Sequence, residues 1–246
     1  MDYEKDFQDI EFNTEYGSIH CKHHSGSSDP IILIHGLAAS TKTWTRLLSY
    51  LPQTLDVYLV DLLGHGKSDA PETEYTVHIQ VEILRALVQK QNLDNVYLFG
   101  HSYGGWVAAV YAKSYPTKGI IIEDSAGLEE FYMEVKGAES RKKYKEDLIK
   151  KALALDAKKH VIEAILDDEF IEGQLEAKDL KLIKVPTLII WGSDDNVIDV
   201  KFSRIFRNEI KGSRLSIIQG ARHTPHYTNS EEVSKLLLGF INNTRM

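Results

Sequence analysis

The chain has 246 residues, 43% of them hydrophobic and 26% charged, which is the composition of a globular protein long enough to bury a full core. Its 36 acidic and 29 basic residues give a net charge of −7, which repels a phosphate backbone and excludes nucleic acid as an expected partner. Its apolar runs are far shorter than the ~20 residues that span a bilayer, and its first residues lack a signal-peptide pattern. We therefore expect a cytoplasmic protein without a membrane span.

Short apolar runs rich in β-branched residues recur along the chain. They lie at residues 31–34, 57–60, 96–99, 120–122, 187–190 and 215–218. Helical patterns lie between them, near residues 42–50, 76–92, 104–114, 200–210 and 231–243. The runs are apolar throughout rather than alternating, which is typical of parallel strands covered on both faces. This alternation of strand and helix predicts an α/β protein with a doubly wound, mostly parallel sheet.

The alternation is interrupted once, between residues 126 and 184, where Lys- and Glu-rich helical segments such as 141–151 replace the strands. We predict a helical cap subdomain over 126–184, inserted into a core formed by residues 1–125 and 185–246. The basic run 141–151 is typical of a solvated helix face, and recognition of an anionic substrate is the alternative. Four apolar side chains in the cap either line an acyl pocket or seat the cap on the core: Phe131, Tyr132, Met133 and Phe170.

A G-x-S-x-G pattern, Gly100-His101-Ser102-Tyr103-Gly104, stands between the strand at 96–99 and the helical pattern that follows. In that context the glycines let strand and helix backbones pass closely around a sharp turn that exposes the serine hydroxyl. Ser102 is therefore the predicted nucleophile. The backbone N–H of Tyr103, at the helix start, is placed to face the oxyanion that forms when a serine attacks a carbonyl.

A serine nucleophile needs a neutral imidazole to take its proton and a carboxylate to orient that imidazole. In this kind of fold the chain order is serine, acid, histidine. Asp194 and Asp195 follow the strand at 187–190, and His223 follows the strand at 215–218, so the order is met.

These motifs resemble those of the α/β-hydrolase family over nearly the whole chain, most weakly across the cap. The family's His-Gly after its third strand is similar to His35-Gly36-Leu37, and its Asp-x-x-Gly-His-Gly-x-Ser resembles residues 61–68. The resemblance implies an α/β-hydrolase fold in which the backbone N–H of Leu37 is the second oxyanion donor. His35 and His65 are then expected to brace loops by hydrogen bonding.

The resemblance also favours one acid and one base. The family's Gly-x-x-Asp-x-Val loop matches Asp195, whereas Asp194 lies one place early and Asp124, after the strand at 120–122, is an alternative acid. The family's Gly-x-x-His pattern matches His223, and His226 is an alternative that faces the same cleft. The predicted catalytic residues are Ser102, Asp195 and His223.

The predicted function is hydrolysis of a small-molecule carboxylic ester with a small to medium acyl chain, through an acyl-enzyme and without a cofactor. Carbon–carbon bond hydrolysis and cofactor-free peroxidation are alternatives on the same fold, and a non-catalytic ligand receptor is an alternative of another class. We expect a monomer or a homodimer.

Two other patterns suggest different chemistry. Residues 36–43, Gly-Leu-Ala-Ala-Ser-Thr-Lys-Thr, differ at one position from the P-loop of nucleotide hydrolases, because Thr41 stands where that loop needs a glycine. Residues 20–24, His-Cys-Lys-His-His, lack a recognised metal-ligand spacing, and we interpret them as a surface strand with no metal. Cys21 is the one cysteine, so an internal disulfide is excluded.

Overall fold

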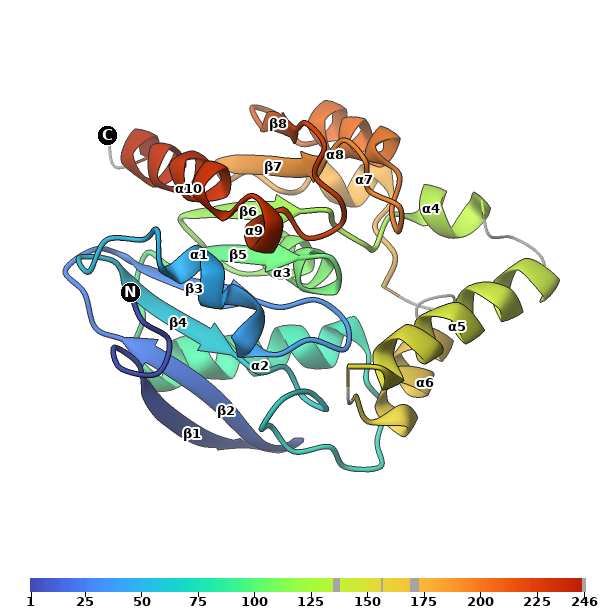
Figure 1. Ribbon diagram of the computed structural model, residues 1–246, viewed down its shortest axis with the longest axis horizontal. Coiled ribbons are helices and arrows are strands. Elements are labelled where there is room, and N and C mark those ends of the chain that lie inside the picture. The colour runs from blue at the N-terminus through green and yellow to red at the C-terminus, as the bar shows by residue number, and fades with distance from the viewer. Residues whose placement is uncertain (135–137, 156, 169–172, 245–246) are drawn as a thin grey trace.

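A single eight-stranded sheet organises the protein, in the order β1-β2-β4-β3-β5-β6-β7-β8 (Figure 1). The computed structural model describes residues 1–134, 138–155, 157–168 and 173–244. The strands are β1 (Gln8–Thr14), β2 (Gly17–His24), β3 (Pro30–Ile34), β4 (Asp56–Val60), β5 (Tyr97–His101), β6 (Gly119–Glu123), β7 (Thr187–Gly192) and β8 (Arg214–Ile218). The pairs from β4 through β8 are parallel, and β2 is antiparallel to both β1 and β4. The predicted mostly parallel α/β sheet is confirmed.

Helices connect the strands and cover both faces of the sheet. They are η1 (Thr41–Trp44), α1 (Thr45–Leu48), α2 (Val77–Lys90), α3 (Tyr103–Ser114), α4 (Glu129–Glu134), α5 (Ala138–Leu153), α6 (Lys159–Asp168), α7 (Ala177–Leu180), η2 (Val200–Phe202), α8 (Ser203–Glu209), α9 (Pro225–Thr228) and α10 (Ser230–Thr244). The five helical regions expected outside the cap are all present.

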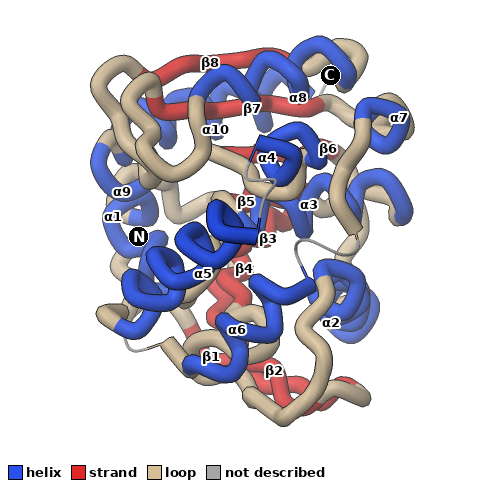
Figure 2. The backbone as a smooth tube through the Cα atoms, turned by 90° about the vertical axis from the view of Figure 1, so that its right-hand side faces the viewer, coloured by secondary structure: helices blue, strands red, loops and turns tan. Residues whose placement is uncertain are grey.

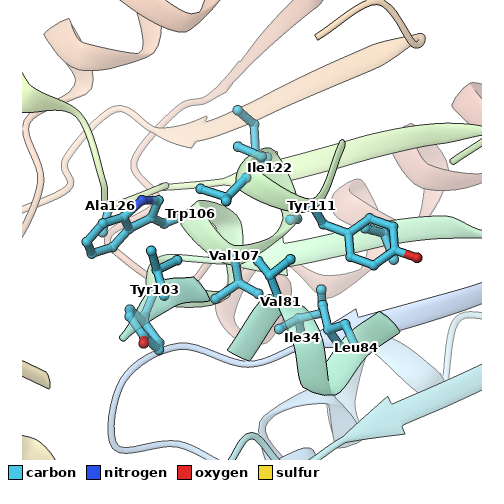
Figure 3. Close-up of a cluster of buried hydrophobic side chains, with 14 of the residues drawn as sticks. Ile34, Val81, Leu84, Tyr103, Trp106, Val107, Tyr111, Ile122 and Ala126 are labelled. Atoms are coloured by element: carbon cyan, nitrogen blue, oxygen red, sulfur yellow. The ribbon is translucent and has the colours of Figure 1, made fainter. Parts of the chain in front are cut away.

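Alternate residues of the central strands enter two separate hydrophobic cores. In β3, Ile32 and Ile34 belong to the core under α2 and α3, whereas Ile31 and Leu33 belong to the core under α1 and α10. Figure 3 shows part of the first core, where side chains of α3 meet those of α2 and β3. Both faces of the central strands are therefore buried, which is why runs such as 31–34, 57–60 and 120–122 are apolar at every position.

The β1–β2 hairpin was not predicted from the apolar runs. β1 is an edge strand with one buried residue, Phe12, so its sequence carries little apolar signal. β2 lies between β1 and β4, and this corrects the interpretation of residues 20–24 as a surface strand: the segment is a strand, but His20 and Lys22 are buried.

The chain between β6 and β7 forms a helical cap. In Figures 1 and 2, α5 and α6 lie beside one another, outside the sheet and beyond the ends of the central strands. Side chains from the two helices form a small apolar cluster, Ala152, Ile162 and Leu166, that packs against Leu37 and Ala38 of the loop after β3. The cap insertion is thus confirmed, and its limits of 126–184 stay a prediction.

The apolar side chains singled out in the cap have different surroundings. Phe131 and Tyr132 are buried, and the Phe131 ring lies 5.6 Å from that of Phe202 on the body of the protein. These contacts fit a role in seating the cap. Met133 is exposed, and Phe170 lies outside the described residues. Within the described part of the chain, no helix is long and apolar enough to cross a membrane.

We expect Gly100→Ala to lower the free energy of unfolding by at least about 3 kcal/mol, because the added Cβ would lie 2.1 Å from the carbonyl oxygen of Gly104. Gly239→Ala is the matched control: its added Cβ meets nothing within 4 Å, so helix propensity alone should stabilise α10 by up to about 1 kcal/mol. Denaturant unfolding measures both, and equal midpoints for the two variants would contradict the packing argument.

Candidate active site

Ser102 stands at the turn between β5 and α3. Its backbone has φ 52° and ψ −115°, a conformation that costs energy for a residue with a side chain. The turn is possible because α3 passes very close to the sheet: an added Cβ at Gly104 would lie 2.2 Å from the carbonyl oxygen of Ile34. This crossing presents the serine hydroxyl at the carboxyl edge of the sheet.

The Ser102 hydroxyl is hydrogen-bonded to His223, which is hydrogen-bonded to Asp195. The Ser102 Oγ to His223 Nε2 distance is 3.0 Å, and the His223 Nδ1 to Asp195 Oδ2 distance is 2.8 Å. Asp195 Oδ1 accepts the backbone N–H groups of Val197 and Ile198, at 2.8 and 3.0 Å. Those two bonds fix the Asp195 side chain, which is fully buried, so that its other oxygen faces the imidazole.

The two alternative acids have other partners. Asp194 is an exposed loop residue whose Oδ1 accepts the hydroxyl of Ser193, at 2.6 Å. Asp124 is buried and accepts the backbone N–H of Gly192, at 2.9 Å. Burial, reinforced by the neighbouring Glu123 and Asp195, raises the pKa of Asp124 well above its usual value, which favours the neutral acid. Of the three aspartates, the structure brings Asp195 to His223.

The main chain of His223 is held by the histidine of the serine turn. His101 Nε2 donates a hydrogen bond to the carbonyl oxygen of His223, at 2.6 Å. Burial, together with the nearby His226 and His223, holds the pKa of His101 well below its usual value, so the ring stays neutral. In the sequence, His101 occupies a variable position of the G-x-S-x-G motif, and only its place beside Ser102 could have indicated a role in the site.

His226, the alternative base, lies in a separate buried cluster. Its Nδ1 is hydrogen-bonded to the carboxyl group of Glu123 at the end of β6, and its Nε2 to the hydroxyl of Thr43, at 2.8 Å. Both the His226 and the Glu123 side chains are fully buried. His226 therefore joins the His223 loop to β6 and to η1, and its described partners do not include Ser102.

The predicted oxyanion donors flank Ser102 from two sides. Tyr103 is the first residue of α3, where backbone N–H groups point out of the helix end. Leu37 follows Gly36, which lies against the turn: a Cβ added at Gly36 would come within 3.2 Å of Ser102 Cβ. The structure thus places both residues beside the serine, and their role as donors stays a prediction.

Buried histidines brace the loops behind the oxyanion residues, as expected. His35 is hydrogen-bonded to the carbonyl oxygen of Gly36 and accepts the backbone N–H of Leu62, at 2.8 and 3.1 Å. His65 Nδ1 donates to the carbonyl oxygen of Leu63, at 3.1 Å. The two rings lie 5.1 Å apart.

Asp61 joins three segments around the same loops. It accepts the backbone N–H groups of Thr41 and Lys67, at 2.7 and 3.0 Å, and is hydrogen-bonded to His20 Nδ1 at 2.8 Å. Burial alone would raise its pKa, but the His20 bond, the nearby His35 and the backbone donors outweigh burial and lower it to about 2. Asp61 is therefore a carboxylate at neutral pH.

Two groups of side chains bring three potential metal ligands within 4.8 Å of one another among the described residues: His101, Glu123 and His226, and Asp124, Asp195 and His223. In each group an imidazole is hydrogen-bonded to a carboxyl group, which accounts for the proximity. We assign no metal or cofactor to either group. Residues 20–24 belong to neither.

Comparison with known proteins identifies the family. The sequence model described as "alpha/beta hydrolase fold" matches residues 29–162, more than half of the chain. A monoacylglycerol lipase of Xenopus laevis is 25% identical over 256 residues, which cover 88% of this chain and 76% of that protein. Lipase 1 of Psychrobacter immobilis is 26% identical over 243 residues, 84% of this chain and 75% of that one. The chain belongs to the alpha/beta hydrolase fold family, and the predicted resemblance is confirmed.

Solved structures support the same fold. A lipase of Acinetobacter baumannii, described as putative, superimposes with a TM-score of 0.81 at 24% identity and covers 98% of this chain and 92% of its own. An esterase of Thermogutta terrifontis superimposes with a TM-score of 0.80 at 19% identity, over 97% of this chain and 100% of its own. At the level of the family, the prediction of a hydrolase is confirmed.

We expect protonation of His65 to destabilise the protein in acid. Burial and the neighbouring His35 lower the pKa of His65 to about 3, whereas an unfolded histidine titrates near 6.5. The unfolded state therefore binds the extra proton first, and this contribution to stability is lost as the pH falls below ~6.5. Between pH 7 and pH 5, wild type should lose about 2 kcal/mol more unfolding free energy than His65→Gln. Denaturant unfolding at each pH measures both proteins. An equal loss of unfolding free energy in wild type and His65→Gln would contradict the lowered pKa of His65.

We expect His226→Ala to lower the unfolding free energy by about 3 to 5 kcal/mol, because it leaves the buried carboxyl group of Glu123 without its imidazole. The exposed His160→Ala should change it by less than about 0.5 kcal/mol. Combining Glu123→Leu with His226→Phe removes both polar partners and should be less destabilising than His226→Ala alone. Urea midpoints test the three variants, and a wild-type midpoint for His226→Ala would rule out the argument.

Proposed function

We propose that the protein is a serine hydrolase that cleaves carboxylic esters through an acyl-enzyme. The observation that carries the proposal is the continuous hydrogen-bonded series from Ser102 through His223 to Asp195. A hydroxyl, an imidazole and a buried carboxylate in that order form the set of groups that makes a serine nucleophilic at neutral pH. Lipases among the relatives support an ester as substrate.

The reaction follows from these contacts. His223 Nε2 takes the proton of Ser102 as Oγ attacks the ester carbonyl, and Asp195 stabilises the imidazolium that forms. The N–H groups of Leu37 and Tyr103 bind the oxyanion, each contributing about 3 to 4 kcal/mol in the transition state. His223 then protonates the departing alcohol. Water, activated by His223, attacks the acyl-enzyme and releases the acid.

The contacts of the loop after β3 argue against the nucleotide-hydrolase alternative. The backbone N–H of Thr41 is directed to the carboxylate of Asp61, at 2.7 Å, whereas a P-loop turns its N–H groups toward phosphate. A carboxylate at this point would also repel a phosphate bound by the main chain.

We propose esters with small to medium acyl chains as substrates.

A fluorophosphonate probe should label Ser102, and the label should be absent from Ser102→Ala.

Asp195→Asn should lower kcat for a p-nitrophenyl ester by about 10⁴-fold, because the amide no longer fixes the His223 tautomer. Asp124→Asn is the matched control: the amide oxygen still accepts the Gly192 N–H, so kcat should change by less than about tenfold. Mass spectrometry locates the label and steady-state kinetics measures the rates. An unlabelled Ser102 in folded protein would refute the proposal, and a larger loss in Asp124→Asn would reassign the acid.

A further inference from the structure

A cavity of about 600 Å³ opens between the loop after β3 and the cap. Residues 38–43 form one wall, the turn at 64–67 forms a second, and the cap contributes Leu155, Ala157, Lys158 and Ile162. The volume is in the range of small-molecule sites.

The cavity lies close to the proposed nucleophile. Gly36 packs against Ser102, and Ala38, which lines the cavity, is two residues further along the same loop. Two residues of extended chain reach about 7 Å, so the cavity begins within roughly 10 Å of Ser102. The cavity lining itself does not include Ser102 or His223, so a substrate with its ester bond at Ser102 would extend past this loop to place a group in the cavity.

Three lysines line this cavity in a protein of net charge −7: Lys42, Lys67 and Lys158. One carboxylate, Asp61, is among the lining residues; it is buried and already bound by His20 and two backbone N–H groups. Lys67 Nζ lies 3.6 Å from the half-exposed Asp9, at the long end of an ion pair. The lining therefore carries an excess of positive charge.

Lys158 differs from three other cap lysines that are paired with carboxylates. Lys142, Lys145 and Lys159 each form an ion pair with a cap carboxylate. Lys158 Nζ instead donates to the carbonyl oxygen of Ser68, at 3.3 Å, across the junction between cap and core. Among the described residues, neither Lys158 nor Lys42 has a carboxylate within 4.0 Å. Neither side chain is therefore paired with a described carboxylate that would compete with an anionic ligand.

One part of the lining is apolar and consists of Ala38, Ala39, Leu155, Ala157 and Ile162. Polar residues complete it: Tyr3, Ser40, Thr41, Thr43 and His65. An apolar wall beside ammonium groups suits a ligand that combines a hydrocarbon chain with an anionic group.

We propose that this cavity is an anion subsite, which binds a carboxylate or phosphate group carried by the ester substrate while the apolar wall contacts the adjoining chain. The proposal rests on the proposed function, because it assigns the substrate class of that same site. Lys42 lies within the run that resembles a phosphate-binding loop. In this proposal its side-chain ammonium group binds the anion, and the backbone N–H groups of the loop do not.

Two matched pairs of substrates test the proposal and show on which side of the ester bond the anion lies. For the acyl side, the mono-4-nitrophenyl ester of glutaric acid is compared with 4-nitrophenyl pentanoate. For the alcohol side, a 1-acylglycerol 3-phosphate is compared with the 1-acylglycerol of the same chain. We expect at least a tenfold higher kcat/KM for the anionic member of one pair. Raising the salt concentration to about 0.5 M should reduce that preference, because salt screens exposed charges.

Charge variants connect the preference to the cavity. Lys67→Met combined with Lys158→Met keeps most of the apolar stems and should reduce the preference at least fivefold, because KM rises more for the anionic ester than for the neutral ester. Lys67→Arg combined with Lys158→Arg keeps both positive charges and should retain the preference for the anionic ester. Lys150→Met with Lys151→Met is the matched control, since these exposed cap lysines do not line the cavity and should leave the preference intact.

The outcomes separate the two proposals. If the fluorophosphonate probe labels Ser102 and neutral esters are hydrolysed, but neither anionic substrate is preferred, the anion subsite is refuted and the proposed function stands. The subsite is also refuted if the control pair of lysines lowers the preference as much as the cavity pair. If Ser102 is not labelled and no ester is hydrolysed, both proposals fall.

Discussion

The site depends on the close crossing of α3 over β3 and β5. Side chains larger than hydrogen at Gly100 or Gly104 would overlap main-chain carbonyl groups at 2.1 to 2.2 Å. That crossing forces Ser102 into its left-handed conformation and sets the first turn of α3 against the loop after β3. Ser102, the first residue of α3 and the Gly36-Leu37 segment are therefore positioned by one contact between backbones, and the buried cores on both faces of the sheet hold that contact in place.

Three acidic residues at the neighbouring ends of β6 and β7 illustrate how local surroundings separate chemically similar groups. Asp195 is fixed by two backbone donors and meets His223, Asp124 accepts a backbone N–H and is favoured in its neutral form, and Glu123 meets His226. Buried acids this close cannot all carry charge, because their repulsion in a low dielectric is large. The distribution of partners places a histidine next to two of them and favours the neutral form of the third, Asp124.

The cap contacts the same loop that carries a proposed oxyanion donor. Its apolar cluster packs on Leu37 and Ala38, and its Lys158 reaches the carbonyl oxygen of Ser68. The walls of the proposed anion subsite thus come from the cap and from the core together. The proposed anion subsite and the loop that carries Leu37 share these contacts, so changes in the cap are expected to act on both.

The sequence by itself determined the parallel sheet, its helices outside the cap and the family, because runs buried on both faces stay apolar throughout and the serine turn needs its glycines in order. It left Asp124 and His226 open as alternatives to Asp195 and His223, and it missed the β1–β2 hairpin, whose edge strand buries one side chain. Only the tertiary structure decided which residues meet, since hydrogen bonds such as His101 to His223 join positions 122 residues apart. Sequence spacing cannot report such contacts, because the distances depend on how separate strands align at one edge of the sheet.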